Sequence, residues 1–127
     1  MAKSFEELEV WQLSRKLSDK IYKVTSLDRF RKDFELVKQI NRSSGSCMDN
    51  IAEGFERGGN RELIQFLFIS KGSIGETRSQ VYRGFDREYI SKQQFEELIN
   101  DCLEISKRIS GFIKYLKQSE FEGEKFH

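Results

Sequence analysis

The sequence predicts an all-α protein, and three observations carry that prediction. The 127-residue chain has no proline and is 34% charged, which favours long helices because proline interrupts them. Apolar residues recur at spacings of three and four along most of the chain, as they do on one face of a helix. Capping signals and glycines divide this pattern into four segments. Four helices with short connections favour an antiparallel, up-down-up-down four-helix bundle.

The first helix is predicted to begin at Ser4, because S-F-E-E has the form of a capping box in which Glu7 reaches back. Its acidic residues come early and its basic residues late, which matches the helix dipole. The apolar stripe of this helix consists of Val10, Leu13, Leu17, Ile21 and Val24. The charged connection at 27–33 then offers Asp28 and Asp33 as caps for the next helix.

The second helix is predicted over about 34–57, and Gly58 and Gly59 end it because glycine readily takes the left-handed conformation. Its stripe consists of Val37, Ile40, Ser44, Met48, Ile51 and Phe55. Asn60 is the predicted cap of the third helix, which should reach about Phe85.

The fourth helix has the most regular pattern in the chain. S-K-Q-Q at Ser91 is a second capping-box candidate. The stripe that follows consists of Phe95, Leu98, Cys102, Ile105, Ile109, Phe112 and Leu116. We expect one domain over residues 1–119 and a frayed tail at 120–127, where no helical stripe continues.

The third helix carries more apolar surface than one bundle can cover. Leu63–Ile69 directs large apolar groups around most of the helix, and such a helix is buried on nearly all sides. Either another subunit covers the excess, or the loop after Gly58 folds back over it. We expect an oligomer, with an interface drawn from Trp11, Ile64, Phe66, Phe68 and Ile69.

Small and polar residues are concentrated at 41–77, inside predicted helices. Glycine in a helix interior costs about 1 kcal/mol relative to alanine, so Gly45, Gly72 and Gly75 indicate the close approach of another chain segment or a ligand. We interpret Gly72 and Gly75 as room for a neighbouring helix. A polar stripe on the second helix is either a solvated face or a network between helices, with Asn50 and Glu53 as partners in the network. The stripe consists of Gln39, Arg42, Ser43, Ser46, Asn50, Glu53 and Arg57.

Composition excludes several classes of protein. A net charge of +1 rules out a polycation, and the chain has neither a long hydrophobic run nor a signal-peptide pattern. Cys47 and Cys102 are expected to be buried thiols in a reducing cytoplasm, although a disulfide between them is an alternative. The single histidine is His127 and no E-x-x-H pair occurs, so we expect no enzymatic activity, cofactor or metal.

Nucleic-acid binding would require several lysines and arginines on one surface. The candidates are Arg15, Lys16, Lys20, Lys23, Arg29, Arg31, Lys32, Arg42, Arg78, Arg83 and Arg87. For the basic residues of the first helix, matching of the helix dipole is an alternative explanation. No pattern of exposed aromatic residues indicates base stacking, so we expect contacts directed by phosphate and shape.

Three segments resemble the four-helix-bundle proteins encoded in intervening sequences of bacterial 23S rRNA genes. They are F-E-E-L-E-V-W-Q-L-S-R-K-L, I-N-R-S-S-G-S-C-M-D-N-I-A-E-G-F-E-R-G and F-L-F-I-S-K-G-S-I-G-E-T-R-S-Q. The accessory variability determinant of diversity-generating retroelements is a related branch. The resemblance implies an antiparallel bundle, a ring of five subunits, and binding of RNA or other nucleic acid. It also implies structural roles for the motif positions Gln39, Ser46, Asn50, Glu53, Gly54, Gly72, Ser73, Glu76 and Thr77.

The chain departs from the family pattern in two places. The connection before the second helix lacks the usual proline, and Ser43–Gly45 replaces a range that often holds a basic residue. From the composition, the basic residues and the family resemblance together, we expect a non-enzymatic, cytoplasmic homo-oligomer that binds structured RNA or other nucleic acid through its phosphates. The alternative is an oligomeric scaffold that binds a protein partner such as a reverse transcriptase.

Overall fold

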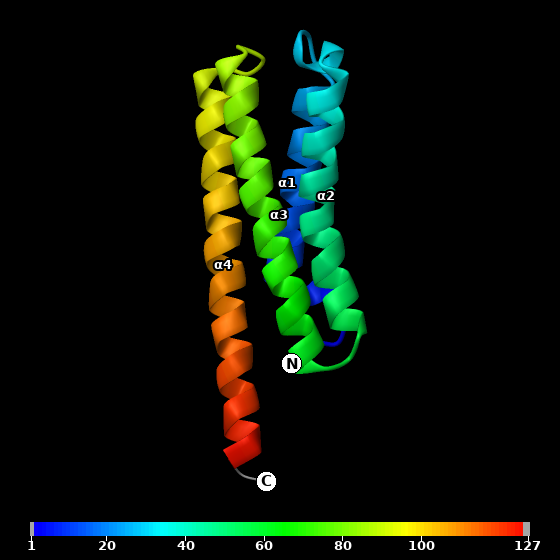
Figure 1. Ribbon diagram of the computed structural model, residues 1–127, viewed down its shortest axis with the longest axis vertical. Helices are drawn as coiled ribbons and strands as arrows, with labels where there is room; N and C mark the ends of the chain where they lie inside the picture. The colour runs from blue at the N-terminus through cyan, green and yellow to red at the C-terminus, as the bar shows by residue number, and fades with distance from the viewer. Residues whose placement is uncertain (1, 126–127) are drawn as a thin grey trace.

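The computed structural model describes the backbone of residues 2–125 and the side chains of residues 2–120, and these residues form four α-helices with no strand. The elements are η1 (Phe5–Glu7), α1 (Glu9–Thr25), η2 (Phe30–Lys32), α2 (Phe34–Glu56), α3 (Asn60–Asp86) and α4 (Lys92–Lys125), where η1 and η2 are single 3-10 turns. The helices lie lengthwise beside one another, with α1 next to α2 and α3 next to α4 (Figure 1). The prediction of an all-α chain with four helices is confirmed.

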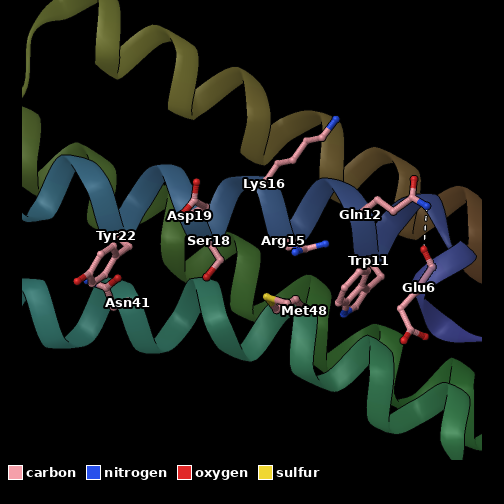
Figure 2. Close-up of a pocket in the computed structure, with 10 residues that line it drawn as sticks. All are labelled: Glu6, Trp11, Gln12, Arg15, Lys16, Ser18, Asp19, Tyr22, Asn41 and Met48. Carbon is pink, nitrogen blue, oxygen red and sulfur yellow. Dashed lines mark hydrogen bonds between the residues drawn. The ribbon is translucent and has the colours of Figure 1, made fainter.

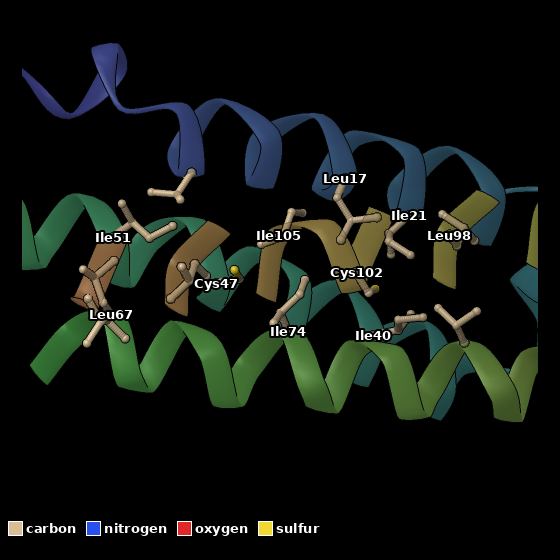
Figure 3. Close-up of a cluster of buried hydrophobic side chains, with 14 of the residues drawn as sticks. Leu17, Ile21, Ile40, Cys47, Ile51, Leu67, Ile74, Leu98, Cys102 and Ile105 are labelled. Carbon is tan, nitrogen blue, oxygen red and sulfur yellow. The ribbon is translucent and has the colours of Figure 1, made fainter. Parts of the chain in front are cut away.

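One apolar core runs along the helices, and each α-helix contributes to it (Figure 3). Leu17 of α1, Ile51 of α2, Leu67 of α3 and Ile105 of α4 are all almost completely buried. In the predicted stripe of α4, the two phenylalanines are only partly buried and the other five residues are buried. Ile113 joins them in the core, so α4 buries a slightly wider face than the stripe alone suggested.

Three predicted helix-end signals are present. The Asp33 carboxylate accepts the N–H of Leu36 at 3.2 Å and caps α2. Before α4, the Gln94 N–H donates to Ser91 Oγ at 3.1 Å while the Ser91 N–H donates to Gln94 Oε1 at 2.8 Å, which completes a capping box. Gly58 has φ +87°, the left-handed conformation expected after the end of α2.

The predicted start of α1 at Ser4 is wrong. The segment after Ser4 forms only the 3-10 turn η1, and α1 begins at Glu9. The Glu7 carboxylate accepts the N–H of Lys3 at 2.6 Å, so the reciprocal capping box does not form. Leu8, which packs against the core, has extended backbone (φ −74°, ψ 125°) and separates the two helical segments.

Two other boundaries differ from the prediction. Asn60 is the first residue of α3, and the cap position is taken by Gly59, whose backbone is extended. At the other end of the chain, α4 continues to Lys125, so residues 120–125 are helical where no helical stripe was found. Glutamate and lysine are good helix formers, which favours this continuation. The rest of the expected tail, 126–127, lies outside the described residues.

The glycines fall into two groups. A Cβ on Gly54 would lie 2.6 Å from Phe66 Cβ and 3.3 Å from Leu63 Cδ1, so this glycine allows α2 and α3 to approach closely. Around Gly45, Gly72 and Gly75, by contrast, an added Cβ would meet nothing within 4 Å. No helix within the described residues therefore explains these three glycines.

Gly54→Ala is expected to lower the free energy of unfolding by about 1–3 kcal/mol, because the methyl group overlaps Phe66 in a tightly packed interface. The control is Gly111→Ala, at an exposed helical position with open space around it. That change should raise stability by about 0.5–1 kcal/mol. Urea unfolding at one fixed protein concentration measures both. Equal stability of Gly54→Ala and the parent would contradict the close approach.

Candidate nucleic-acid and subunit interfaces

Part of the polar stripe of α2 lies against α3 and is not a solvated face. Ser43 is buried, and its hydroxyl lies 2.7 Å from Thr77 Oγ1 and donates to Gln80 Oε1 at 2.6 Å. Further along the two helices, Ser46 Oγ lies 3.1 Å from Ser73 Oγ. These hydroxyl and amide groups form a polar seam between α2 and α3, as the network interpretation predicted.

The polar seam continues in both directions. The buried Ser70 hydroxyl donates to the carbonyl of Cys47 at 2.8 Å. Toward the other end, Arg83 Nη1 donates to Gln39 Oε1 at 2.8 Å. Among the side chains of residues 2–120, no buried nitrogen or oxygen lacks a hydrogen-bond partner. The polar groups of the seam therefore form hydrogen bonds with one another, and none of them requires a ligand as its partner.

Two members of the predicted network behave differently. Asn50 Nδ2 donates to the carbonyl of Ser46 at 2.8 Å and to its hydroxyl at 2.9 Å, so it supports the seam from within α2. Glu53 instead forms an exposed ion pair with Arg57 of the same helix at 2.9 Å. The prediction of an interhelical partner for Glu53 is wrong, because its carboxylate points to solvent. Arg42 is likewise exposed.

Both cysteines are free and buried, as predicted. Burial raises the pKa of Cys47 to about 11 and that of Cys102 to about 12. Neither thiol is therefore ionised to any useful extent at neutral pH, which makes them poor nucleophiles. Among the side chains that the structure describes, no cluster of three or more histidine, cysteine, aspartate or glutamate residues is placed to hold a metal ion.

Several candidate nucleic-acid-binding residues are already paired. Lys20 donates to Asp101 at 2.8 Å and to Glu97 at 3.1 Å, and so links α1 to α4. The hydrogen bond to Asp101 is the main reason that the pKa of Lys20 is raised. Lys23 pairs with Asp19 of its own helix at 2.9 Å. These lysines have carboxylate partners with which a phosphate would have to compete.

A second group of basic residues lies at the end of the molecule where the α1–α2 connection meets the α3–α4 turn (Figure 1). The Asp33 carboxylate accepts from Arg87 Nη1 at 2.7 Å and from the Tyr89 hydroxyl at 2.9 Å. The Arg29 guanidinium lies over the Tyr89 ring, 5.9 Å from its centroid. This cluster ties the two connections together.

Other predicted cations remain available. Arg31 and Lys32 are exposed on η2, and neither forms an ion pair within the described part of the chain. Arg15 and Lys16 of α1 are also exposed and without an ion pair there. Arg78 is partly buried. The available cations are therefore fewer than predicted, and they lie at the end of the bundle and on α1.

A groove of about 960 Å³ lies between α1 and α2 (Figure 2). The Arg15 guanidinium lies 5.7 Å from the centroid of the Trp11 ring, and that ring packs edge-on against Phe5. Tyr22 is 65% exposed. The groove is lined by Glu6 of η1, by Trp11, Gln12, Arg15, Lys16, Ser18, Asp19 and Tyr22 of α1, and by Asn41 and Met48 of α2. The sequence predicted Trp11 as an interface residue and Arg15 as a nucleic-acid contact but did not group them into one surface, although the positions 11, 15, 18 and 22 share helical spacing.

The apolar segment of α3 is only partly covered by its own chain. Ile64 packs against the core, and Phe66 lies over Gly54 with the Arg57 guanidinium above its ring. Phe68 and Ile69, however, remain 49% and 50% exposed. The residues after Gly58 do not cover these two side chains, so that alternative is wrong for them.

Phe68 belongs to a longer exposed line on α3 that we call the α3 stripe. It consists of Phe68, Gly72, Gly75, Ser79 and Tyr82, all exposed. The stripe borders α4, because Lys117 Nζ lies over the Phe68 ring at 5.1 Å and Tyr82 packs edge-on against Phe95. It therefore lies on the α3–α4 side of the molecule, away from the groove.

Comparison with known proteins identifies the family. A family model described as 23S rRNA-intervening sequence protein matches residues 6–111, most of the chain. The chain belongs to this family. The resemblance predicted from the sequence motifs is thus confirmed. The matched segment of this 23S rRNA-intervening sequence family member ends within α4, and the remaining turns of that helix lie beyond it.

A solved structure supports the same family. A protein with unknown function from the S23 ribosomal protein family of Bacteroides thetaiotaomicron VPI-5482 is 30% identical in sequence, with a TM-score of 0.75. The similarity covers 83% of this family member and 98% of that chain. None of the curated proteins matches. Within the described residues, no helix has the length and apolar character needed to cross a membrane.

Asp33 makes stability depend on pH. Burial by itself raises the pKa of this carboxyl, but the Leu36 N–H, the Tyr89 hydroxyl and the Arg87 guanidinium outweigh that effect and hold the pKa below its ordinary value. An aspartate whose pKa is lowered by folding stabilises the fold above its unfolded pKa, about 4. That contribution disappears as the pH falls through the lowered folded value.

Asp33→Asn is therefore expected to lower the free energy of unfolding by about 1 kcal/mol at pH 7 and to lose less stability than the parent on acidification. Asp28→Asn is the matched control, since Asp28 is exposed and its φ of +44° suits asparagine. Urea unfolding at a series of pH values from neutral to acid makes the comparison. Parallel pH curves for Asp33→Asn and the parent would contradict this account.

Proposed function

We propose that this protein is a non-enzymatic, cytoplasmic subunit of a homo-oligomeric ring that binds structured RNA or other nucleic acid through phosphate contacts. Each subunit would be an up-down-up-down antiparallel bundle, and the family resemblance implies five of them. The observation that carries the proposal is the group of cations on the α1–α2 connection. Arg29, Arg31 and Lys32 lie within one four-residue stretch, and none has an ion-pair partner among the side chains of residues 2–120.

A ring is needed to make this group effective. Acidic residues lie nearby, and the net charge of +1 gives one subunit no strong long-range field. Repetition around a ring would place several such groups within reach of one nucleic acid and raise their effective concentration. Asp33 supports this use of the connection, because its bonds to Arg87 and Tyr89 hold the connection in place.

The exposed apolar residues of α3 support association between copies. Phe68 and Ile69 are both about half exposed and are neighbours in sequence, next to the glycines that no helix of the described chain approaches. Apolar groups on one surface favour burial against a partner. The free, buried thiols of Cys47 and Cys102 are in keeping with a reducing cytoplasm. The reference to 23S rRNA in the name of the family is the reason for choosing RNA as the first ligand to test.

The oligomer is tested by mass. Light scattering on the purified protein should give a multiple of the chain mass, with five as the expected multiple. Phe68→Ser together with Ile69→Ser should reduce that mass while far-ultraviolet circular dichroism stays unchanged, because both side chains are already about half exposed. Tyr115→Ser is the control, since Tyr115 is 59% exposed on α4 and outside the proposed interface. A monomeric parent protein would refute the oligomer.

RNA binding is tested by its salt dependence. Affinity for a structured hairpin RNA should fall by at least about tenfold between about 50 and 200 mM salt if several phosphates are contacted. Arg31→Gln with Lys32→Gln should weaken binding and make the dependence on salt shallower, by about 0.9 in the logarithmic slope per lost contact. The control pair Lys107→Gln and Lys114→Gln removes the same charge from exposed positions of α4. Absence of binding at low salt, or equal effects of the two pairs, would contradict the proposal.

The groove favours a second candidate function, a scaffold that binds a protein such as a reverse transcriptase. Tryptophan, tyrosine, arginine and methionine are the side chains enriched in protein interfaces, and all four line the groove. An oligomer that binds no RNA at low salt, but binds a purified reverse transcriptase encoded beside its gene, would favour this function.

A further inference from the structure

Three aromatic side chains lie along the groove between α1 and α2 and just beyond it. Trp11 and Tyr22 line the groove itself, and Tyr22 is mostly exposed (Figure 2). Phe34, the first residue of α2, is 81% exposed, and its ring packs against no other aromatic ring among the described side chains. The three rings come from two helices, so no pattern of exposed aromatic residues was visible in the sequence.

Helical spacing places Phe34 on the face of α2 that lines the groove. Positions 34, 41 and 48 are seven residues apart, about two turns, so Phe34, Asn41 and Met48 form one line, which we call the groove line. The Asn41 amide donates to Thr25 Oγ1 at 3.0 Å, which fixes the last turn of α1 at the level of Asn41. Phe34 therefore lies beyond Tyr22, toward the α1–α2 connection. At 1.5 Å per residue, the groove line is about 21 Å long.

Cations without an ion-pair partner among the described side chains accompany the groove line. Arg15 and Lys16 lie on the α1 side of the groove. At the other end, Arg31 and Lys32 directly precede Phe34 in the sequence. Lys38, which was not among the predicted contacts, is exposed one turn after Phe34 and forms no ion pair with a described residue. A polyanion that follows the groove line would meet cations along most of its length.

The acidic side chains near the groove line leave this path open. Of the two carboxylates that line the groove, Asp19 is paired with Lys23 at 2.9 Å. The other, Glu6, has no ion-pair partner among the described side chains, and it lies at the Trp11 end of the groove (Figure 2). The part of the groove between Trp11 and Tyr22 is therefore lined by unpaired cations and by no unpaired carboxylate.

The groove also presents polar groups that its own chain does not use. Asn41 Nδ2 donates two hydrogen bonds within the chain, and Asn41 Oδ1 accepts none from a described residue. The Ser18 hydroxyl likewise forms no hydrogen bond with a described residue. Gly45 follows Asn41 by four residues and precedes Met48 by three, and an added Cβ there would meet nothing within 4 Å. A flat, polar group can therefore approach the backbone of α2 beside hydrogen-bonding partners.

This combination of groups distinguishes a single strand of nucleic acid from a duplex. In a duplex the bases stack on one another, so an exposed aromatic ring finds mainly backbone. In a single strand the bases stack on aromatic rings and on arginine guanidinium planes, while cations in a groove follow the phosphates. The Arg15 guanidinium, which lies over the Trp11 ring, adds a planar surface of this kind.

We propose that the groove between α1 and α2 binds an unpaired, single-stranded segment of RNA, with bases stacked on Tyr22 and Phe34 and phosphates held by the neighbouring cations. The groove line accommodates about six nucleotides at about 3.4 Å per stacked nucleotide. The inference rests on the proposed binding of nucleic acid, and it names the part of a structured RNA that this surface takes, which is a loop or an unpaired end.

Tyr22→Leu with Phe34→Leu removes the two rings and keeps apolar side chains. Both residues are mostly exposed, so helical content by circular dichroism should not change. Affinity for a fluorescein-labelled RNA of about ten adenylates, measured by fluorescence anisotropy, should fall at least about tenfold. The dependence of affinity on salt should keep the slope of the parent, because no phosphate contact is lost. The control Tyr115→Leu removes an exposed ring of α4 and should bind like the parent.

Trp11 is the single tryptophan of the chain, so its emission reports on the groove directly. The adenylate strand should quench that emission, because bases bind beside the indole ring. A blunt-ended RNA duplex of the same length should leave the emission unchanged. Adenosine monophosphate at the same concentration should also leave it unchanged, because it makes only one of the several stacking and phosphate contacts. Equal quenching by the monophosphate would mean that the groove takes a free nucleotide, and would overturn the proposal.

Comparison with the hairpin RNA separates this proposal from the one on which it rests. If the parent binds neither the strand nor the hairpin at low salt, nucleic-acid binding itself is refuted. If Arg31→Gln with Lys32→Gln weakens hairpin binding, but the ring variant binds the strand like the parent, phosphate-directed binding stands and the groove proposal is wrong. If the ring variant instead loses only its binding to a reverse transcriptase encoded beside the gene, the rings contact a protein, which also overturns the proposal.

Discussion

The close contact between α2 and α3 is the constraint on which the rest of this structure depends. At Gly54 the two helices leave no room for a methyl group, and along the polar seam serine and threonine hydroxyls meet across the interface. A buried hydroxyl that loses its partner costs about 1–3 kcal/mol, whereas each bond formed contributes only about 1 kcal/mol. The main effect of the seam is therefore to destabilise alternative alignments of α3 along α2. Sliding α3 by one turn would leave Ser43 and Gln80 without each other, and would move Phe66 away from Gly54.

The orientation that the seam imposes on α3 determines which of its side chains are exposed to solvent. Ser70, Ser73 and Thr77 face α2, and the core takes Leu67, Ile74 and Val81. Because successive residues of a helix are about 100° apart, the remaining large groups must point elsewhere. Phe68, Ile69 and Tyr82 are consequently exposed. The exposed apolar surface thus follows from a helix that already uses two of its faces within its own chain.

Periodicity predicted the four helices because burial of an apolar face dominates their stability, and the α4 stripe shows this most clearly. The start of α1 was missed because the capping box at Ser4 is a local signal, and the packing of the extended Leu8 against the core overrides it. Glycines were ambiguous for another reason. Gly54 and Gly75 look alike in the sequence, and only the structure tells that one faces a neighbouring helix and the other faces open space.

The candidate surfaces were predicted less completely than the fold, again for physical reasons. Serine is found both in solvated faces and in buried seams, so the polar stripe of α2 had two readings until α3 was placed beside it. The sequence shows which residues are basic, yet it gives no indication that Lys20 meets Asp101 across 81 positions. Trp11 and Arg15 were predicted for different roles and not as one groove, because the residues at 11, 15, 18 and 22 are chemically mixed and apolar spacing does not group them.

The pairing of charges within the chain bears on where nucleic acid would bind an assembled ring. Lys20 and Lys23 on the side of the bundle have carboxylate partners, whereas Arg31 and Lys32 at its end have none among the described residues. Packing between copies through the exposed apolar residues of α3 would occupy a side of each subunit and leave this end open. Cyclic symmetry turns equivalent ends toward the same side of a ring whose subunits stand parallel to its axis. The cations of the α1–α2 connection would then form one circle on one face, whereas a two-fold dimer of antiparallel copies would separate them to opposite ends. The arrangement of the subunits, more than the charge of any one of them, would therefore decide whether the protein presents a surface that an RNA backbone can follow.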